Sequence, residues 1–228
     1  MEFRKLKEDE IDCRVSQIAS NYCTLLLYKD ARVDMNILDE TLGSMNWQKH
    51  YSRDNANCIV SIWDSEKYEW IEKEDTGTES NTEAEKGLAS DSFKRACFNW
   101  GIGRELYTAP SIIIFPKKEM GIKGKDEFYE KDNGKYETKT RFWVEYIDYL
   151  DNKIQNLIIR DNKNNIRFTQ LTKDKEEELL KIDKALTKAI EKAEEKGIDR
   201  EDLYKRYNVD SISKMLIGEK KELLEVLK

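Results

Sequence analysis

The chain has 228 residues, of which 38% are charged and 39% hydrophobic, and its formal net charge is −6 at pH 7. This length fits one large domain or one domain with a small appendage, and five Trp and eleven Tyr supply apolar bulk for a core. No apolar run approaches the roughly 18 residues that a membrane-spanning helix needs, and the charged residues 1–10 do not resemble a signal peptide. We therefore expect a cytoplasmic protein that does not enter a membrane.

The acidic balance lowers the expectation of nucleic-acid binding. It does not exclude it, because screening over about 10 Å lets an acidic protein carry a locally basic groove. The thiols and the imidazole are scattered without a C-x-x-C pair: Cys13, Cys23, Cys58, Cys97 and the one histidine, His50. This distribution argues against a zinc site, a redox pair or a disulfide framework, and we expect the cysteines to be small buried hydrophobic residues.

In chain order, residues 11–28 combine clustered apolar residues with an amphipathic pattern, which we interpret as a helix or a mixture of helix and strand. Residues 30–42 are typical of a strand start followed by a short helix. Its expected buried face is Val33, Ile37, Leu38 and Leu42, and Gly43 ends it. From Trp47 the period changes to two. Residues 47–53, 57–64 and 68–75, joined by DNAN and DSEKY turns, predict an antiparallel meander.

A capped helix is predicted after this sheet. Thr82 and Glu85 have the spacing of a capping box, and Gly101 and Gly103 stop the helix. Residues at three- and four-residue steps form one apolar stripe: Ala89, Phe93, Ala96, Cys97 and Trp100. The opposite side carries Asp91, Lys94 and Arg95. The resulting element order is β-β-β-α.

The second half of the chain is expected to add a strand at 111–115, a long loop at 117–139, a hairpin at 140–160 and a short strand at 165–168. Helices are predicted at 173–196, 199–207 and 213–227 and are able to pack as a small bundle. The fold class is therefore α+β, with an antiparallel β-β-β-α core, an extra hairpin and a small C-terminal helical region. The alternating charges of these helices fit a solvated face, or alternatively a surface that docks a partner.

No enzyme signature is present. The chain lacks a G-x-x-x-x-G-K-[ST] loop, and the G-I-G at 101–103 lacks the following glycine of a dinucleotide fingerprint. Six carboxylates near the third strand permit a metal-dependent nuclease as an alternative: Asp64, Glu66, Glu69, Glu72, Glu74 and Asp75. The other interpretation of these acids is a solvated or ion-paired surface.

Five basic residues are candidates for contacts with nucleic-acid phosphates: Lys29, Arg32, Lys94, Arg95 and Arg104. A basic pair on a helix that a sheet supports is a plausible phosphate cradle. Each of them has a structural alternative, and Lys94 and Arg95 could simply be the exposed side of a helix. Asp91 stands four residues before Arg95, which allows an ordinary helix pair worth about 0.3–0.5 kcal/mol. Arg104 follows the helix end, where it would complement the helix dipole.

Three blocks in this order resemble the Rad-fifty-two family of single-strand annealing proteins, particularly its bacteriophage members. They are ARVDMNILDETLGSMNWQ (31–48), VSIWDSEKYEWIEKEDTGTES (60–80) and EAEKGLASDSFKRACFNWGIGREL (83–106). The resemblance covers about half of the chain, and it implies that Arg32, Lys94 and Arg95 contact the DNA backbone. Phe98 and Ser44 depart from the family pattern, since some members carry a basic and an aromatic residue there. Either Arg104 or Lys29 completes the groove, or binding is weaker.

The same resemblance implies ATP-independent binding of single-stranded DNA and annealing of complementary strands in recombination or repair. Residues 1–169 would form the annealing domain, which assembles into a ring or helical filament, and residues 170–228 a helical domain that could recruit a single-strand binding protein. Annealing needs no catalytic group, metal or other cofactor, so by this interpretation the chain is not an enzyme. Its partners would be single-stranded DNA and the annealed duplex, in the host's cytoplasm if a phage encodes the chain. An interaction or scaffolding module without nucleic acid is a third possibility.

Overall fold

The computed structural model describes residues 1–78, 84–117 and 127–227, and its fold is α+β with antiparallel sheets. The chain divides into two compact units. The first comprises residues 1–11 and 28–108, and the second comprises residues 12–27 and 109–228. This division differs from the expected boundary at 169/170, because the C-terminal helices share a unit with a large sheet. Within the described residues, none of the helices has both the length and the hydropathy to cross a membrane.

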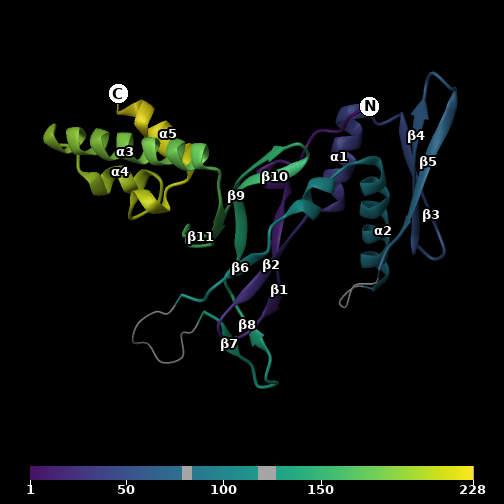
Figure 1. Cartoon of the computed structure of the whole chain (residues 1–228), viewed down its shortest axis with the longest axis horizontal. Helices are drawn as coiled ribbons and strands as arrows, with labels where there is room; N and C mark the ends of the chain where they lie inside the picture. Colours follow the sequence, from purple (N-terminus) through teal and green to yellow (C-terminus); the bar gives the residue numbers. More distant parts are fainter. Residues whose placement is uncertain (79–83, 118–126, 228) are drawn as a thin grey trace. The chain divides into compact units, whose positions relative to one another are not determined.

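The first unit contains the predicted meander. Its strands lie in the order β3 (Trp47–Ser52), β4 (Asn57–Asp64) and β5 (Glu69–Thr76). Helix α2 (Ala84–Trp100) lies against one face of this sheet (Figure 1). The period of two in the sequence is therefore a correct indicator here, and the order β-β-β-α is confirmed.

The stripe on α2 packs as expected. Phe93, Ala96 and Cys97 are fully buried, and the indole of Trp100 donates a hydrogen bond to the Val60 carbonyl on β4 at 3.0 Å. The predicted capping box cannot be placed, since Thr82 and the side chain of Glu85 lie outside the described residues.

Helix α1 (Ala31–Leu42) packs beside α2. The sequence suggested that a strand begins at Asp30. In the structure, Asp30 instead caps the helix, because its side chain accepts a hydrogen bond from the Arg32 amide at 2.8 Å. The buried face consists of Asp34, Ile37 and Leu38. Gly43 ends the helix with a φ of 78°, as predicted.

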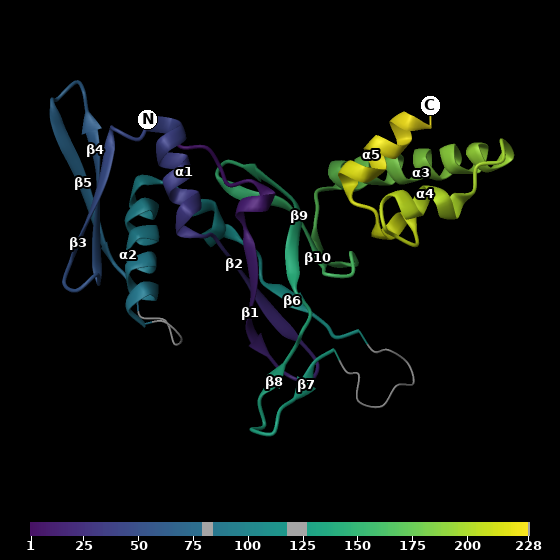
Figure 2. The same ribbon diagram turned by 180° about the vertical axis from the view of Figure 1, so that it is seen from behind.

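The second unit is built on a six-stranded sheet (Figure 2). Its order is β11 (Ile166–Gln170), β10 (Lys153–Asp161), β9 (Phe142–Leu150), β1 (Asp12–Ile18), β2 (Cys23–Tyr28) and β6 (Ile112–Ile114). The expectation of a helix in residues 11–28 is wrong, because this segment forms β1 and β2. A run such as CTLLLY fits either state, and pairing with β6 decides it: Cys23 lies opposite Ile114 and Leu25 opposite Ile112.

In the segment 117–139, which was expected to be a loop, residues 118–126 lie outside the described residues, and the described part contains strands. It contains a short hairpin of β7 (Tyr129–Glu130) and β8 (Tyr136–Glu137), closed by a turn in which Gly134 has a φ of 74°. The turn residues Asn133 and Gly134 are a hairpin signal that the charged composition of the segment obscured.

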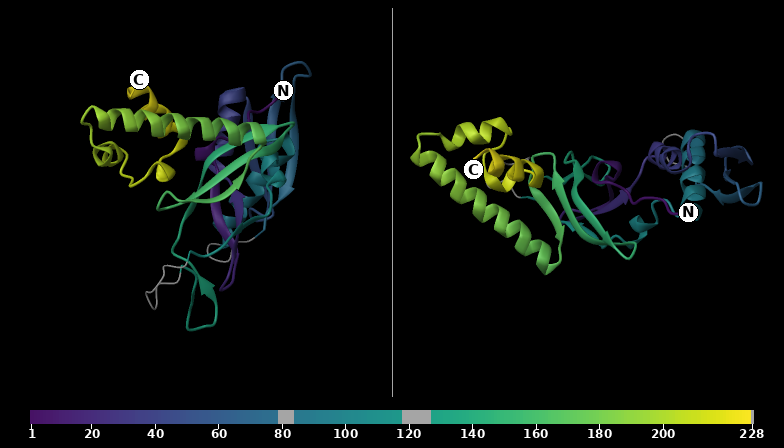
Figure 3. Two further views of the ribbon diagram at one scale, coloured as in Figure 1. Left: turned by 60° about the vertical axis from the view of Figure 1, so that its left-hand side comes forward. Right: turned by 90° about the horizontal axis from the view of Figure 1, so that it is seen from above.

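Three α-helices follow, as predicted: α3 (Lys173–Glu195), α4 (Arg200–Arg206) and α5 (Ile217–Val226). Figure 3 shows α4 and α5 beside α3. They enclose a core of six buried residues: Leu186, Ile190, Ala193, Leu203, Met215 and Leu223.

A buried ion pair joins these helices to the sheet. Arg160 on β10 is 1% exposed and donates to Glu145 on β9 at 2.5 Å, to the Ser213 carbonyl at 3.0 Å and to the Met215 carbonyl at 2.9 Å. The second oxygen of Glu145 accepts a hydrogen bond from the amide of Ile217, the first residue of α5, at 2.7 Å. The start of α5 is therefore hydrogen-bonded to the interior of the sheet.

The residue after β5 must be glycine, because the backbone at Gly77 lies very close to the backbone of α2. A Cβ at this position would lie 2.5 Å from the Ser92 nitrogen and 2.6 Å from the Leu88 oxygen, both backbone atoms that cannot rotate away. We expect Gly77→Ala to lower the free energy of unfolding by about 1–3 kcal/mol. Urea unfolding followed by tryptophan fluorescence measures this change.

Gly218→Ala is the matched control. Gly218 lies in α5 with open space around its Cβ position, so alanine there should be neutral or should stabilise the helix by up to about 1 kcal/mol. If Gly77→Ala unfolds at the same urea concentration as the wild-type chain, the close approach is not a constraint.

Candidate nucleic-acid interface

The five predicted basic residues all lie in the first unit, but they have different surroundings. Lys29 is only 7% exposed, and its ammonium forms an ion pair with Asp34, which is fully buried on α1. The lysine stem also packs against Gly103, where a Cβ would collide with it. The prediction that Lys29 contacts DNA therefore conflicts with its position: its charge compensates a buried carboxylate and does not face solvent.

Burial raises the pKa of Asp34 to about 6, although the positive charges of Lys29 and Lys94 oppose this shift. One carboxylate oxygen, Oδ2, has no hydrogen-bond partner among the described residues. Asp34 therefore sits in an environment that disfavours its charged form, and the adjacent cations make that form tolerable.

Arg32 lies at the surface, two residues before Asp34. Its side chain is 83% exposed, and it donates from Nε to Asp30 Oδ1 at 2.8 Å and from Nη2 to Asp30 Oδ2 at 3.2 Å. The hydrogen bonds from the Arg32 side chain and amide, with a smaller contribution from the Lys94 charge, lower the pKa of Asp30 to about 2. Arg32 is thus accessible to a ligand, but it already has a carboxylate partner.

Lys94 on α2 approaches the same carboxylates from the neighbouring helix. Its charge acts on both Asp30 and Asp34, so it lies close to the beginning of α1. No carboxylate among the described side chains is within ion-pair distance of its ammonium. Lys94 is therefore within electrostatic range of Asp30, the carboxylate that pairs with Arg32.

Arg95 belongs to a different group of contacts. It donates to Asp91 at 2.9 Å, which is the helix pair that the four-residue spacing suggested. Asp91 also accepts hydrogen bonds from the amide and the hydroxyl of Thr78, at 2.9 and 3.1 Å. Burial alone would raise the pKa of Asp91, but the hydrogen bonds from Thr78 and Arg95 bring it below its ordinary value. The carboxylate of Asp91 therefore binds both Arg95 and Thr78, which lies two residues after the end of β5.

Arg104 closes the end of α2. Its guanidinium donates to the carbonyl of Phe98 at 2.8 Å and to that of Asn99 at 2.7 Å. These are carbonyls of the last helical turn, so the geometry agrees with the structural alternative, in which Arg104 complements the helix end.

Lys49 is a basic residue that sequence reasoning missed. It is exposed on β3, its ammonium lies 4.5 Å from the centre of the Phe93 ring, and its charge reaches Cys97. The signal was present in the alternation of β3, where Trp47, Lys49 and Tyr51 share the face that packs on α2. Lys49 therefore adds a further positive charge beside Phe93.

The carboxylates of β5 do not converge. Glu72 accepts a hydrogen bond from the Ser61 hydroxyl at 3.2 Å on the outer face of the sheet. Asp75 is on the face toward α2 and accepts one from Asn99 at 3.1 Å. Among the residues that the structure describes, no three His, Cys, Asp or Glu side chains are grouped so that they could hold a metal ion.

The two aspartates at the start of α1 should titrate far apart. We expect a midpoint near pH 2 for Asp30 and near pH 6 for Asp34 in carboxyl-carbon NMR of the folded chain. Because the folded-state pKa of Asp34 is raised, its contribution to stability is present below pH 4 and is lost as the pH rises through 6. Two midpoints near the ordinary value of 4 would contradict the burial described above.

Comparisons with protein-family models, with curated proteins and with solved structures found no match for this chain. The resemblance to the Rad-fifty-two family therefore continues to rest on the residue pattern of the three blocks in 31–106. The function and partners that it implies stay predictions.

Proposed function

We propose that this chain binds single-stranded DNA and anneals complementary strands without ATP, as an assembly of side-by-side copies that acts in cytoplasmic DNA recombination or repair. The observation that carries the proposal is the exposed guanidinium of Arg32 beside Asp30 at the start of α1, with the charge of Lys94 on α2 within electrostatic range of the same carboxylate. Arg32 and Lys94 are two of the three positions that the family resemblance assigns to the DNA backbone.

The carboxylate partners of Arg32 and Arg95 do not prevent phosphate binding. Both arginines are substantially exposed, at 83% and 43% of their side chains, and exposed ion pairs are worth only about 0–1 kcal/mol. A DNA strand that brings several phosphates can therefore replace Asp30 at little cost, and it gains from the release of its condensed counterions.

An exposed aromatic residue lies near Arg95. Tyr107 is 75% exposed, its ring centre is 4.6 Å from that of Phe98, and its hydroxyl is close enough to influence the Arg95 charge. Proteins that bind single strands without reading sequence combine positive side chains with aromatic stacking. Tyr107 would offer such a surface to a base while the backbone contacts the arginines.

Annealing requires little further chemistry. Bound phosphates are neutralised, the strand is held extended, and base edges remain available for a complementary strand that supplies the specificity. Side-by-side assembly has a structural basis in β3 and β5, the edge strands of the three-stranded sheet in the described part of the chain. Their outer backbone groups can pair with another copy, and such a heterologous contact closes into a ring or continues as a filament.

Replacing Arg32 and Lys94 by alanine should weaken binding of a labelled oligothymidine by roughly threefold to tenfold per residue. Each lost phosphate contact should also reduce the slope of log affinity against log salt by about 0.7. Fluorescence anisotropy over a range of salt concentrations measures both, and circular dichroism checks folding.

Arg200→Ala with Lys205→Ala is the matched control, because it removes the same two charges from exposed side chains of the C-terminal helices, where Arg200 pairs with Glu194 at 2.7 Å and Lys205 with Asp202 at 3.0 Å. Equal losses of affinity for oligothymidine in the interface variant and in the control variant would mean that only the total charge of the protein matters. Wild-type annealing should also persist in EDTA. Strand cleavage that requires a divalent metal would favour the nuclease alternative.

Asp30→Asn should have the opposite effect. Asparagine preserves the N-cap of α1 but removes the charge that competes for Arg32 and Lys94. We expect tighter binding of oligothymidine at low salt, by roughly threefold, with a difference that shrinks as salt increases. Asp210→Asn, which removes the partner of Lys214 elsewhere, changes the net charge equally and should have little effect. If the Asp30→Asn variant binds oligothymidine with unchanged affinity, Asp30 is not part of the DNA interface.

A further inference from the structure

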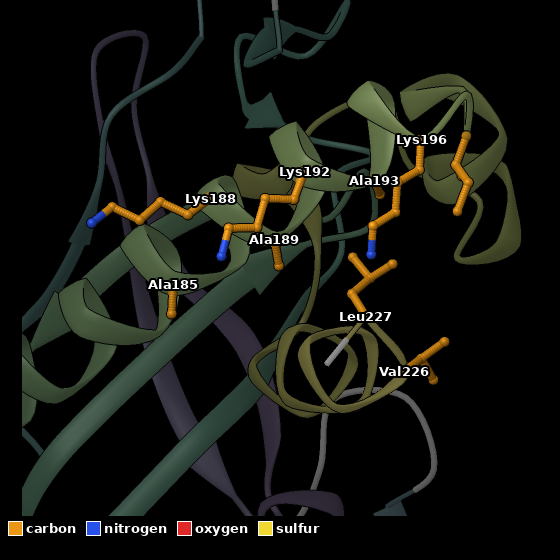
Figure 4. A pocket seen from close by; sticks show the side chains of 9 residues that line it. Ala185, Lys188, Ala189, Lys192, Ala193, Lys196, Val226 and Leu227 are labelled. Atoms are coloured by element: carbon orange, nitrogen blue, oxygen red, sulfur yellow. The ribbon is translucent and has the colours of Figure 1, made fainter.

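A groove in the C-terminal helices has a composition that the DNA-binding proposal does not use. It has a volume of about 570 Å³ and lies between α3 and the end of α5 (Figure 4). Two lysines of α3 and Lys196, which caps the end of this helix, line it together with six apolar side chains: Ala185, Ala189, Ala193, Ile198, Val226 and Leu227. Its size is that of a site for a small ligand or a short peptide segment.

The lysines of the groove carry uncompensated charge. Lys188, Lys192 and Lys196 follow one another at four-residue steps, and in Figure 4 the ammonium groups of Lys192 and Lys196 point toward the α5 side of the groove. No carboxylate lines the groove, and none among the described side chains is within ion-pair distance of these three lysines. Other lysines of this region, such as Lys205 and Lys220, do have carboxylate partners. Like charges at this spacing repel, so an anion would relieve the repulsion.

The groove also has an apolar and accessible part. It is formed by the alanines of α3 together with Val226, which is 61% exposed, and Ile198, which is 41% exposed. Small side chains on α3 leave room for a larger apolar side chain to enter, and its burial would contribute roughly 25 cal/mol for each Å² removed from water.

We propose that this groove binds an acidic peptide segment of a partner protein that also carries a large apolar side chain. The carboxylates would pair with Lys188, Lys192 and Lys196, while the apolar side chain would pack on Val226 and Leu227. A nucleic-acid strand fits less well, because the groove lining offers alkyl groups and no aromatic ring on which a base could stack. The proposal does not depend on DNA binding by the first unit.

The test uses the full chain and a fluorescent synthetic peptide of Asp and Glu residues with two central leucines. We expect binding at low salt by fluorescence anisotropy. Lys192→Glu with Lys196→Glu should weaken it by roughly tenfold or more, since attraction is replaced by repulsion. The control, Lys205→Glu with Lys221→Glu, makes the same charge change on exposed lysines outside the groove and should bind almost as the wild type does. Val226→Ser, or serines in place of the peptide leucines, should weaken binding while leaving its salt dependence intact.

Three outcomes would overturn the proposal. They are the absence of peptide binding at low salt, equal losses from the groove and control variants, and peptide affinity that does not depend on the leucines. Oligothymidine serves as a competitor. If it displaces the peptide from wild-type protein but not from the Arg32 and Lys94 alanine variant, the peptide is binding at the DNA interface instead of the groove. If it binds the groove more tightly than the peptide does, the site is for nucleic acid.

Discussion

The arrangement of the candidate interface depends on the buried ion pair of Lys29 and Asp34. A carboxylate that is fully buried is tolerated only with a compensating charge, and removing one partner of such a pair typically costs about 3–5 kcal/mol. Lys29 precedes α1 and packs on Gly103, which follows α2. The pair therefore fixes the start of α1 against the end of α2. Asp30, Arg32 and Lys94 take their positions from that junction.

The charges of Arg32, Arg95 and Lys94 suggest how an acidic protein could offer a surface to phosphate. Arg32 and Arg95 each pair with an aspartate, whereas Lys94 has no described carboxylate at ion-pair distance. If the proposed function holds, such a surface would keep little net charge until a strand exchanged with the aspartates. Binding of this kind would be weak per contact, would depend strongly on salt and would reverse easily. Reversibility would suit an annealing protein, because it must release the duplex after pairing.

Local patterns predicted the elements that are stabilised locally. The alternation in β3, β4 and β5 and the stripe of Phe93, Ala96 and Cys97 were sufficient for the β-β-β-α order. The prediction of helix within residues 11–28 was wrong, because pairing with β6, which is distant in the chain, decides that this segment forms strands. Short apolar runs carry no period that separates a buried strand from a helix.

The candidate site was predicted less completely than the fold. The family pattern implies that Arg32 and Lys94 contact DNA, which stays a prediction. The burial of Lys29 was not predictable from the sequence, because it depends on a carboxylate five residues later and on a glycine far along the chain. Arg104 was left with two interpretations, and only the positions of the Phe98 and Asn99 carbonyls distinguish them. Basic residue type alone does not show whether a side chain faces solvent, a carboxylate or a helix end.

The contacts of Arg160 and Glu145 have a mechanical consequence for the C-terminal helices. Glu145 accepts a hydrogen bond from the first amide of α5, and Arg160 donates to the Ser213 and Met215 carbonyls in the segment before it. Tension applied to α5 would therefore be transmitted directly to β9 and β10. These strands are interior members of the six-stranded sheet, where force must break many hydrogen bonds at once. A load borne by α5 would therefore meet a rigid anchor, and the helices would resist being peeled away from the strands beneath them.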